Sequence, residues 1–437
     1  MLSDKKERTG KKTREGIVIG YDLSDAFAQI SYYVPGREEP ETLAVVTGTE
    51  QYNIPMVLCK RKEVNQWFFG REAVKFAKEN DGILVEHLVS LARKGEPVDV
   101  GGESFDPVAL LTLFIRRSFS LLNMITTADA LEGVMFTVDD LDKRMVEVLS
   151  RTAANLHLKT DRIYFQSHVE SFYYFTLHQP EELWLHEVLL CDYDYKRLKL
   201  YSLTANRRTT PVVLFIDIDE YKEMEAEEPD AEGGMDEFVK KRLDGLFLEC
   251  VREKCNGRVV SCVYLIGDGY KEDWMGDSLR YLCRGRRVFQ GNNLFGKGAC
   301  YGMMEKLSPR EKEPEYVFLG LDKLKANVGM KLLRQGADSY YAIMDAGVNW
   351  FEAKKEFDVI LEAGDTVQIM LTPLNGREPR EINMILEDIP GRPEWTTRLK
   401  ITAEMISEDQ LSVKVRDMGF GEFFPSSGGE WIRIFEI

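Results

Sequence analysis

The sequence has no run of about 20 apolar residues, the length that a helix needs to cross a bilayer. Its first residues are charged, with no apolar segment behind them, so we expect no secretory signal. It also has little positive charge, because 57 Lys and Arg stand against 73 Asp and Glu, a formal net charge of −16. Since such a chain repels phosphates and anionic lipids, we expect neither nucleic acid nor a membrane as its partner.

The usual spacings of metal and hydrolase sites are also missing. The seven cysteines form no Cys-x-x-Cys pair, and the five histidines form no His-Glu-x-x-His motif. Cys250 and Cys255 come nearest to a ligand spacing, which is weak support for a metal site. An odd number of cysteines in mostly apolar stretches is typical of reduced thiols, so we expect a cytoplasmic protein.

What the chain does have is ample apolar material, 44% of 437 residues, enough for two or three domains. We expect a disordered tail over residues 1–15 and an α/β region over 16–304. A charged linker with two prolines follows over 305–316. Short alternating strands then predict a β-sandwich over 317–437.

The α/β region contains two similar blocks, in each of which a β-hairpin precedes helices. One block opens near Ile17 and the other near Val188, which indicates a weak internal duplication and two lobes over about 16–186 and 187–304. We further expect a helix from the acidic run at 139 to 156 and an acidic mobile loop over 220–234.

Several motifs resemble those of the actin, sugar-kinase and heat-shock ATPase superfamily, and within it the DnaK-type chaperones. Residues 17–24, Ile-Val-Ile-Gly-Tyr-Asp-Leu-Ser, resemble the first phosphate loop, and residues 188–203 resemble the second phosphate hairpin. Residues 265–269 resemble the adenosine motif, and residues 296–299 the closing helix. The shared order and spacing carry the resemblance, rather than any single motif.

The last quarter of the chain shows the same likeness, because residues 385–390 and 411–417 resemble strands of the chaperone's β-type peptide-binding domain. The resemblance therefore implies an α/β two-lobed, actin-like (ribonuclease H-like) ATPase fold followed by a β-sandwich. No region remains for the helical lid of those chaperones.

The resemblance implies ATP or ADP with Mg²⁺ as the cofactor. Asp22 and Asp192 fall at the catalytic acids, which would also be the metal ligands if Mg²⁺ binds, although both could equally be ordinary hairpin acids. The implied nucleotide cleft consists of Ser24, Asp25, Lys196, Arg197, Gly267, Asp268 and Gly269.

The same alignment shows departures that argue against this cofactor. Asp25 places a negative charge where a phosphate would lie, and Tyr195 brings a side chain where glycine amides must approach closely. Lys199 replaces the second acid, Glu86 falls near the catalytic lysine, and Ser167 replaces a glutamate. The site therefore looks degenerate, and we do not expect an efficient ATPase.

Two functions follow from these patterns. The first is a pseudo-ATPase scaffold that binds proteins or extended peptides. The alternative is a nucleotide-dependent chaperone with a rebuilt site in which Lys196 or Arg197 meets the phosphates; an actin-like filament former is a third reading. Aromatic residues near the end of the chain could form a peptide surface or equally pack in the core: Phe420, Phe423, Phe424 and Trp431.

Overall fold

The computed structural model describes residues 16–46, 48–62, 64–79, 82–125, 130–208, 211–229, 234–308, 316–320, 322–334, 336–373 and 378–437. The tail expected at 1–15 and most of the linker expected at 305–316 lie outside these ranges. The chain forms two compact units, which are described separately: the first holds residues 1–205 and 216–313, and the second holds 206–215 and 314–437. No described helix is long and apolar enough to cross a membrane.

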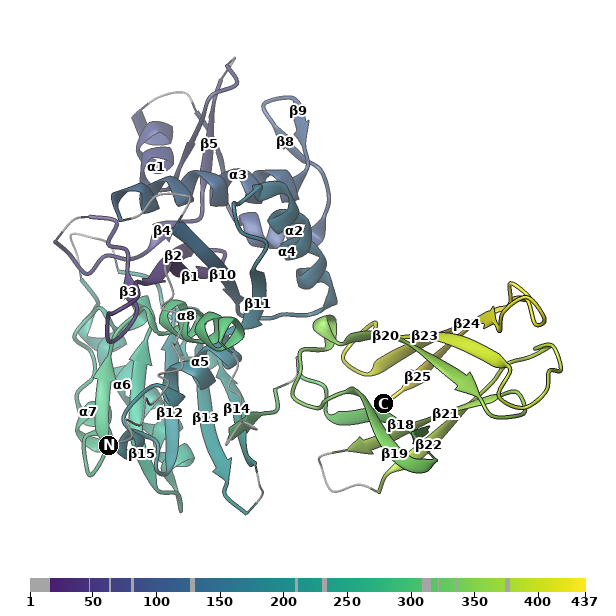
Figure 1. Ribbon diagram of the computed structural model, residues 1–437. Coiled ribbons are helices and arrows are strands. Elements are labelled where there is room, and N and C mark those ends of the chain that lie inside the picture. Colours follow the sequence, from purple (N-terminus) through teal and green to yellow (C-terminus); the bar gives the residue numbers. More distant parts are fainter. Residues whose placement is uncertain are drawn as a thin grey trace, which may run out of the picture. The chain divides into compact units, whose positions relative to one another are not determined.

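The first sheet of the first unit is built on the hairpin at the start of the described chain. Its strands follow the order β11-β10-β1-β2-β3, with β4 also paired to β2. The bounds are β1 (Ile17–Leu23), β2 (Phe27–Tyr33), β3 (Glu41–Thr42), β4 (Ile54–Pro55), β10 (Leu131–Val138) and β11 (Ile163–Ser167). β1 is buried along its whole length and pairs antiparallel with β2 and parallel with β10 (Figure 1).

The second sheet repeats this arrangement, in the order β16-β15-β12-β13-β14-β17, where β17 is Tyr316–Phe318. Its strands are β12 (Glu187–Tyr193), β13 (Leu198–Asn206), β14 (Val212–Tyr221), β15 (Val260–Ile266) and β16 (Arg287–Gln290). β12 pairs antiparallel with β13 and parallel with β15, as β1 does with β2 and β10. The two hairpins therefore hold equivalent positions in two like sheets.

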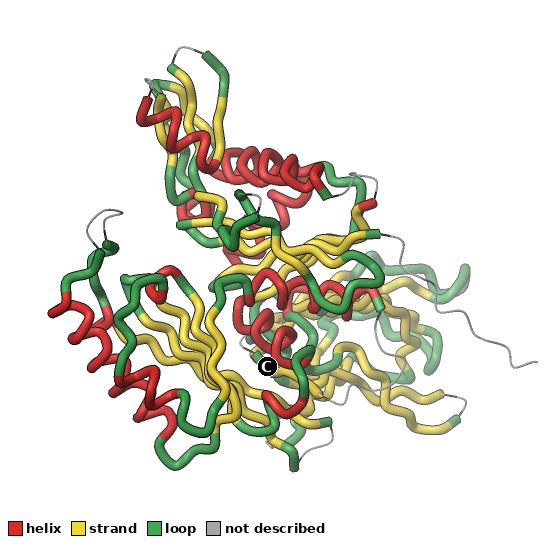
Figure 2. Tube along the Cα trace, turned by 90° about the vertical axis from the view of Figure 1, so that its left-hand side faces the viewer, coloured by secondary structure: helices red, strands yellow, loops and turns green. Residues whose placement is uncertain are grey.

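Helices cover both sheets, and Figure 2 shows them in layers beside the strands. Their bounds are α1 (Gly70–Glu79), α2 (Leu88–Lys94), α3 (Pro107–Ser118), α4 (Lys143–Leu156), α5 (His168–Leu177), α6 (Glu237–Cys255), α7 (Asp277–Leu282) and α8 (Leu294–Leu307). Small strands pair beside α1 and α2: β5 (Leu58–Arg61) with β6 (Trp67–Phe69) and β7 (Gly82–Val85), and β8 (Val98–Val100) with β9 (Glu103–Phe105). Short 3₁₀ turns are η1 (Phe119–Met124), η3 (Glu181–Leu183), η4 (Lys222–Met224) and η5 (Asp268–Tyr270).

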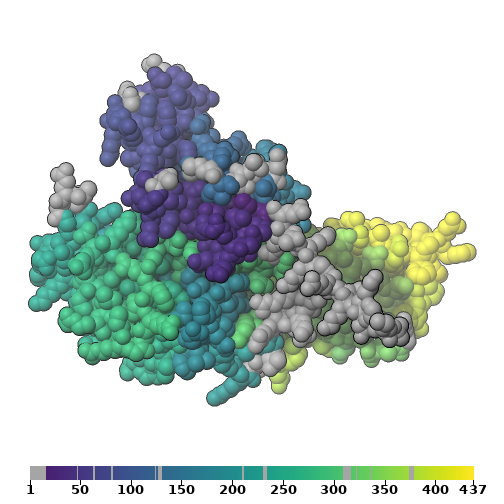
Figure 3. Space-filling view, turned by 60° about the vertical axis from the view of Figure 1, so that its left-hand side comes forward, coloured from purple at the N-terminus to yellow at the C-terminus, as the bar shows by residue number. Residues whose placement is uncertain are grey.

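Glycines bring α8 close to its neighbours in the first unit. A Cβ added at Gly298 would lie 2.0 Å from the Ser171 carbonyl oxygen of α5, and one at Gly20 of β1 would lie 2.2 Å from the Gly296 carbonyl oxygen. These approaches require glycine whatever its backbone conformation. Figure 3 shows purple early segments beside later green segments. Lys297 of α8 pairs with Glu39 at 3.1 Å.

The second unit contains two four-stranded antiparallel sheets, ordered β19-β18-β21-β22 and β20-β23-β24-β25. The bounds are β17 (Tyr316–Phe318), β18 (Ala326–Arg334), β19 (Ala337–Met344), η6 (Trp350–Glu352), β20 (Lys354–Leu361), β21 (Thr366–Pro373), β22 (Arg380–Ile385), β23 (Thr397–Met405), β24 (Gln410–Gly419) and β25 (Glu430–Glu436). Alternate residues of β23 and β24 are buried, which is the pattern of a sheet with one face in a core.

Some boundaries differ from those expected. Residues 206–215, placed above in the second lobe, group with the second unit, because Val212 to Leu214 pair with β17. Glu220 and Tyr221 extend β14 rather than opening a loop, and Lys222–Met224 form η4. The start of the expected linker is helical, since α8 continues to Leu307.

Candidate functional site

A cavity of about 720 Å³ lies in the first unit, at the carboxyl ends of the parallel strands. Asp22 is the penultimate residue of β1, and Asp192 holds the same place in β12. Asp139 follows β10 and His168 follows β11. All four line the cavity. This is the edge of an α/β sheet at which ligands commonly bind.

Asp22 is paired with a cation from its own sheet. The Asp22 carboxylate Oδ1 lies 2.7 Å from His168 Nε2, and only 3% and 6% of the two residues are exposed. The imidazole stacks on the Phe295 ring, with centroids 4.0 Å apart. Burial lowers the pKa of His168, but the carboxylates of Asp22, Asp139 and Asp192 outweigh it, so the pKa is raised. The raised pKa favours the protonated imidazolium, which is the form that neutralises Asp22.

Asp139 is paired with cations from the second sheet. Lys199 Nζ of β13 lies 2.5 Å from Asp139 Oδ1, and Arg197 Nη2 lies 3.2 Å from Asp139 Oδ2. Burial raises the pKa of Asp139, while His168, Lys199 and Arg197 lower it by more, so it stays below its usual range. These ion pairs join the two sheets across the cavity.

Asp192 differs from both of these acids. No hydrogen bond or ion pair to its side chain is found among the described residues. Burial, and then the charges of Asp139 and Asp194, raise its pKa to about 7 against the opposing effect of His168 and Lys199. Near neutral pH this carboxyl therefore exists in both protonation states.

The loop of the first hairpin is held by its own side chains. Ser24 N donates to the Phe27 carbonyl oxygen at 3.0 Å, and Phe27 N donates back to Ser24 Oγ at 3.1 Å. The Asp25 carboxylate accepts a hydrogen bond from Ser90 N at 2.8 Å and another from the Ser90 hydroxyl. Asp25 thus supplies the cap that His87 does not provide at the start of α2.

The loop of the second hairpin satisfies itself in a similar way. Asp194 Oδ1 accepts from both Lys196 N, at 3.1 Å, and Arg197 N, at 3.0 Å. Tyr195 adopts a left-handed backbone, φ 65°, and its side chain is buried beside Tyr193. Two amides that would face a phosphate are therefore already bound to a carboxylate.

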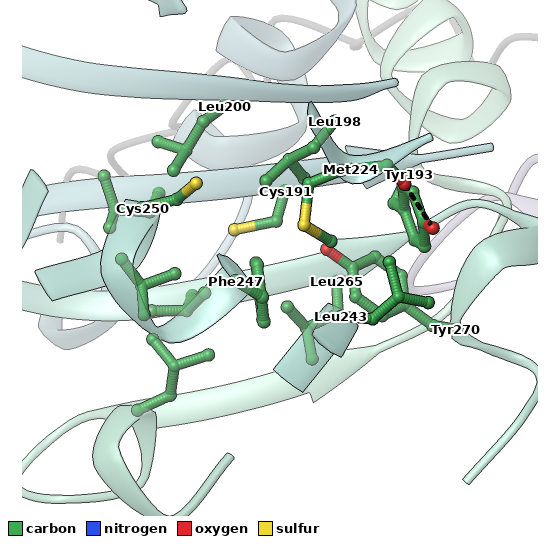
Figure 4. Close-up of a cluster of buried hydrophobic side chains, with 14 of the residues drawn as sticks. Cys191, Tyr193, Leu198, Leu200, Met224, Leu243, Phe247, Cys250, Leu265 and Tyr270 are labelled. Carbon is green, nitrogen blue, oxygen red and sulfur yellow. Dashed lines mark hydrogen bonds between the residues drawn. The ribbon is translucent and has the colours of Figure 1, made fainter. Parts of the chain in front are cut away.

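The glycine turn after β15 fits against Tyr193. A Cβ at Gly267, whose φ is +99°, would lie 2.2 Å from the Tyr193 carbonyl oxygen, and one at Gly269 would lie 2.2 Å from the Tyr193 ring. Figure 4 shows Tyr193 and Tyr270 in the core beside Phe247, with the Tyr193 hydroxyl bound to the Met224 carbonyl oxygen at 2.8 Å. Tyr270 also stacks on Trp274. The positive φ and the Tyr193 backbone thus account for Gly267, and packing against the Tyr193 ring accounts for Gly269.

The structure brings most of the predicted site residues together. The cavity lining includes Asp22, Ser24, Asp25, Asp192, Lys196, Arg197, Gly267 and Asp268. Gly269 is buried outside the lining, and Glu86 is exposed and does not line the cavity. Asp268 is bonded to Asn53 Nδ2 at 3.3 Å and to Lys271 at 3.0 Å.

Sequence reasoning missed His168 and Asp139. Ser167 instead caps α5, accepting from Glu170 N at 3.2 Å, and the next residue enters the cavity. Asp139 was expected to open a helix, but Asp142 caps α4 by accepting from Met145 N, which leaves Asp139 outside the helix. The sequence feature that could have indicated both residues is their position directly after two neighbouring strands, β10 and β11.

The aromatic residues expected at a peptide surface lie after β24 or in β25. Phe423 is 90% exposed, Phe420 is exposed, and Phe424 and Trp431 are half-buried. The loop is anchored at Asp417, whose carboxylate receives two 2.7 Å hydrogen bonds from the buried guanidinium of Arg392. These contacts hold Phe423 on the surface rather than in the core.

The first unit is thus an α/β body of two like sheets with an ion-paired cavity at their carboxyl edges. The chain belongs to the family of unknown function DUF5716, because the model of the C-terminal part of that family matches residues 39–321. Residues 323–437 match a domain of unknown function, DUF8552. No curated protein matches the chain.

Proposed function

We propose that this chain is a DnaK-like protein of the actin-type fold that has lost nucleotide turnover and acts by binding proteins or extended peptide segments. The repeated strand order of the two sheets supports the fold. So does the cavity at the carboxyl ends of β1, β10, β11, β12 and β15. The second unit, with its two antiparallel sheets, is the proposed peptide-binding part.

One observation carries the loss of nucleotide turnover. Phosphate loops hold their ligand with free backbone N–H groups, but Lys196 N and Arg197 N both donate to Asp194 Oδ1. A phosphate would have to displace a carboxylate tethered in the same loop. Asp25 adds a second fixed negative charge on the other side of the cavity.

The acids fit a magnesium ion equally poorly. Asp22 accepts from His168, and Asp139 accepts from Lys199 and Arg197, so cations of the chain itself hold the places that Mg²⁺ would need. Among the described residues, no group of three or more His, Cys, Asp or Glu side chains could hold a metal ion. Of Asp22, Asp139 and Asp192, it is Asp192 whose carboxylate has no partner among the described residues.

A reducing, cytoplasmic location belongs to the same proposal. All seven cysteines are free, and only Cys283 among them is exposed. Buried, unpaired thiols are typical of proteins that fold where disulfides do not form.

The first test is calorimetric titration of the full chain with ATP and ADP, with and without Mg²⁺, together with thermal melting. We expect no heat and no shift in melting temperature at millimolar nucleotide. Micromolar binding that Mg²⁺ strengthens and that Asp22→Asn weakens would overturn the proposal. That result would favour the alternative of a nucleotide-dependent chaperone, in which the exposed Lys196 of the cavity meets the phosphates.

A second test addresses peptide binding directly. The probe is a labelled leucine-rich heptapeptide with a lysine at each end, titrated into the full chain by fluorescence anisotropy. Phe423→Ala should weaken binding at least fivefold, because Phe423 is the most exposed aromatic side chain of the expected surface. Phe238→Ala is the matched control, since Phe238 is 77% exposed but lies on α6. Equal effects of the two substitutions would contradict the proposed surface.

A further inference from the structure

Four arginines lie near the start of β16, at the edge of the second sheet, and two of them contact the Tyr281 ring of α7. The guanidinium carbon of Arg286 lies 5.1 Å from the Tyr281 ring centroid, and that of Arg252 of α6 lies 5.6 Å away. Arg284 lies on the turn between α7 and β16, and Arg287 is the first residue of β16. The ring holds Arg252 and Arg286 by cation–π contact, and Arg286 Nη1 also donates to the Tyr281 carbonyl oxygen at 3.2 Å. Arg287 lies on the opposite face of the sheet, because the next residue of β16, Val288, packs with Tyr281 against the buried cluster.

None of these four arginines makes an ion pair with a described residue. Neighbouring cations do: Arg280 pairs with Asp277 at 2.7 Å, and Arg258 pairs with Glu187 at 2.9 Å. Four unpaired arginines are unexpected in a chain with 73 acids and a net charge of −16. Glu249 and Glu253 lie on α6 beside Arg252 and yet remain unpaired with it. The surface is therefore a local excess of positive charge.

The free edge of the second sheet, β16, carries one of these arginines, Arg287. β16 ends the strand order, and within the described residues it pairs only with β15. Its alternate residues Arg287 and Phe289 are both exposed, and the Phe289 ring stacks on Tyr264 of β15, with centroids 5.6 Å apart. An edge strand with unpaired N–H and C=O groups is a template for a further strand.

We propose that β16, with Arg252, Arg284, Arg286 and Arg287, is a docking site for an acidic polypeptide segment in extended conformation. The segment would pair its backbone with β16 and set its carboxylates on the guanidinium groups, which bind carboxylates in two-pronged geometry. The aromatic side chain of Phe289 lies on the same face of β16 as Arg287 and offers apolar contact there. Neither β16 nor these four arginines line the cavity, so the proposal does not depend on what the cavity binds.

Charge favours a short acidic peptide over a nucleic acid. The rest of the chain is strongly negative and would repel a long polyanion, whereas a segment of a few residues lies within about a Debye length, roughly 8–10 Å, of the arginines. A free strand edge also pairs with a peptide backbone and has no counterpart in a nucleotide chain.

The test titrates the full chain into a labelled eight-residue peptide of alternating Glu and Val. Fluorescence anisotropy measures the affinity at 50 mM and at 300 mM NaCl. The double reversal Arg284→Glu/Arg287→Glu should weaken binding at least tenfold, and raising the salt should weaken binding to the unmodified chain. The matched control is Arg117→Glu/Arg334→Glu, which changes the net charge equally at exposed arginines elsewhere; Arg334 also lies over a tyrosine ring, Tyr341. Its affinity should stay within twofold of the unmodified chain.

Two further probes identify the kind of partner. The same peptide with alternate backbone nitrogens methylated should bind at least fivefold more weakly, because it cannot complete a strand ladder. Equal binding by the methylated peptide would overturn strand addition. Three results would overturn the acidic-peptide assignment. These are equal losses of affinity in the two double variants, no binding at millimolar peptide, and binding of a ten-residue oligothymidylate that is tighter than that of the peptide and is weakened by Arg284→Glu/Arg287→Glu.

Discussion

The two hairpins of the first unit have the same backbone role and opposite electrostatic outcomes. β1 and β12 each pair antiparallel with the next strand and parallel with a later one, and each carries an aspartate at its penultimate position. Asp22 is buried against His168, whereas Asp192 has no bonded partner within the described chain and its pKa is raised to about 7. Equivalent positions thus hold one neutralised acid and one uncompensated acid.

The difference arises two strands away from each aspartate-bearing strand. The strand beyond the central pair is β11 in the first sheet and β16 in the second. β11 is followed by His168, which turns into the cavity, while β16 is followed by Gly291, which has no side chain. The fold repeats, but the residue that would neutralise the second aspartate is missing. Duplicated topology therefore does not duplicate charge.

The largest expected effect follows from removing the cation of the first hairpin. His168→Ala would leave the buried Asp22 carboxylate without its partner, and breaking a buried ion pair costs about 3–5 kcal/mol of unfolding free energy. Urea denaturation at pH 7 measures this loss.

Two variants separate charge from packing at this position. Asp22→Asn/His168→Gln removes both charges and should recover most of the lost stability. His87→Asn changes another histidine of the cavity, at a left-handed position that asparagine tolerates, and should stay within about 0.5 kcal/mol. A loss below 1 kcal/mol in His168→Ala would show that the pair does not stabilise the fold.

At the second hairpin we expect a substitution that raises the unfolding free energy, by less than His168→Ala lowers it. Because the folded pKa of Asp192 is raised above its unfolded value near 4, the folded state favours the neutral acid. The contribution of the neutral Asp192 side chain to the stability of the fold is fully present below about pH 4 and is lost as pH rises through about 7. Asp192→Asn should therefore stabilise the protein by about 1–3 kcal/mol at pH 8 and leave it unchanged at pH 4.

Asp139→Asn is the matched variant for this prediction. The folded pKa of Asp139 is lowered, so its contribution is present above the unfolded pKa and is lost as pH falls. Since the side chain is 38% exposed, its loss should cost only about 1 kcal/mol at pH 8. Stability curves of the two variants from pH 4 to 8 should diverge in opposite directions. A loss of stability in Asp192→Asn at pH 8 would reverse the comparison.

The sequence predicted backbone elements better than it predicted side-chain partners. The hairpins expected near Ile17 and Val188 are both present, because apolar runs and turn residues act locally. The pairing of Asp22 with His168 joins residues 146 positions apart, so no local pattern could indicate it. Likewise, Asp142 caps α4 and leaves Asp139 for Lys199.

The departures from phosphate-loop glycines were visible in the sequence, but their consequences were not. Tyr195 was expected to obstruct a ligand in the loop. In the structure its ring is buried beside Tyr193, and it is Asp194 that binds the loop amides. Which carboxylate binds which amide depends on the φ and ψ angles of a turn, and composition alone does not determine those.

The smallest expected effect compares the two loops directly. Asp25→Ala and Asp194→Ala each remove a carboxylate that accepts backbone amides, and each should cost about 1 kcal/mol of unfolding free energy. The two substitutions should cost similar unfolding free energy but loosen different parts of the structure. Asp25→Ala should speed hydrogen exchange at Ser90 in α2, whereas Asp194→Ala should speed it at Lys196 and Arg197 within the hairpin itself. If both variants exchanged faster at Lys196 and Arg197, the loss of Asp25 in the first loop would also loosen the second loop. The two hairpins would then not be stabilised independently.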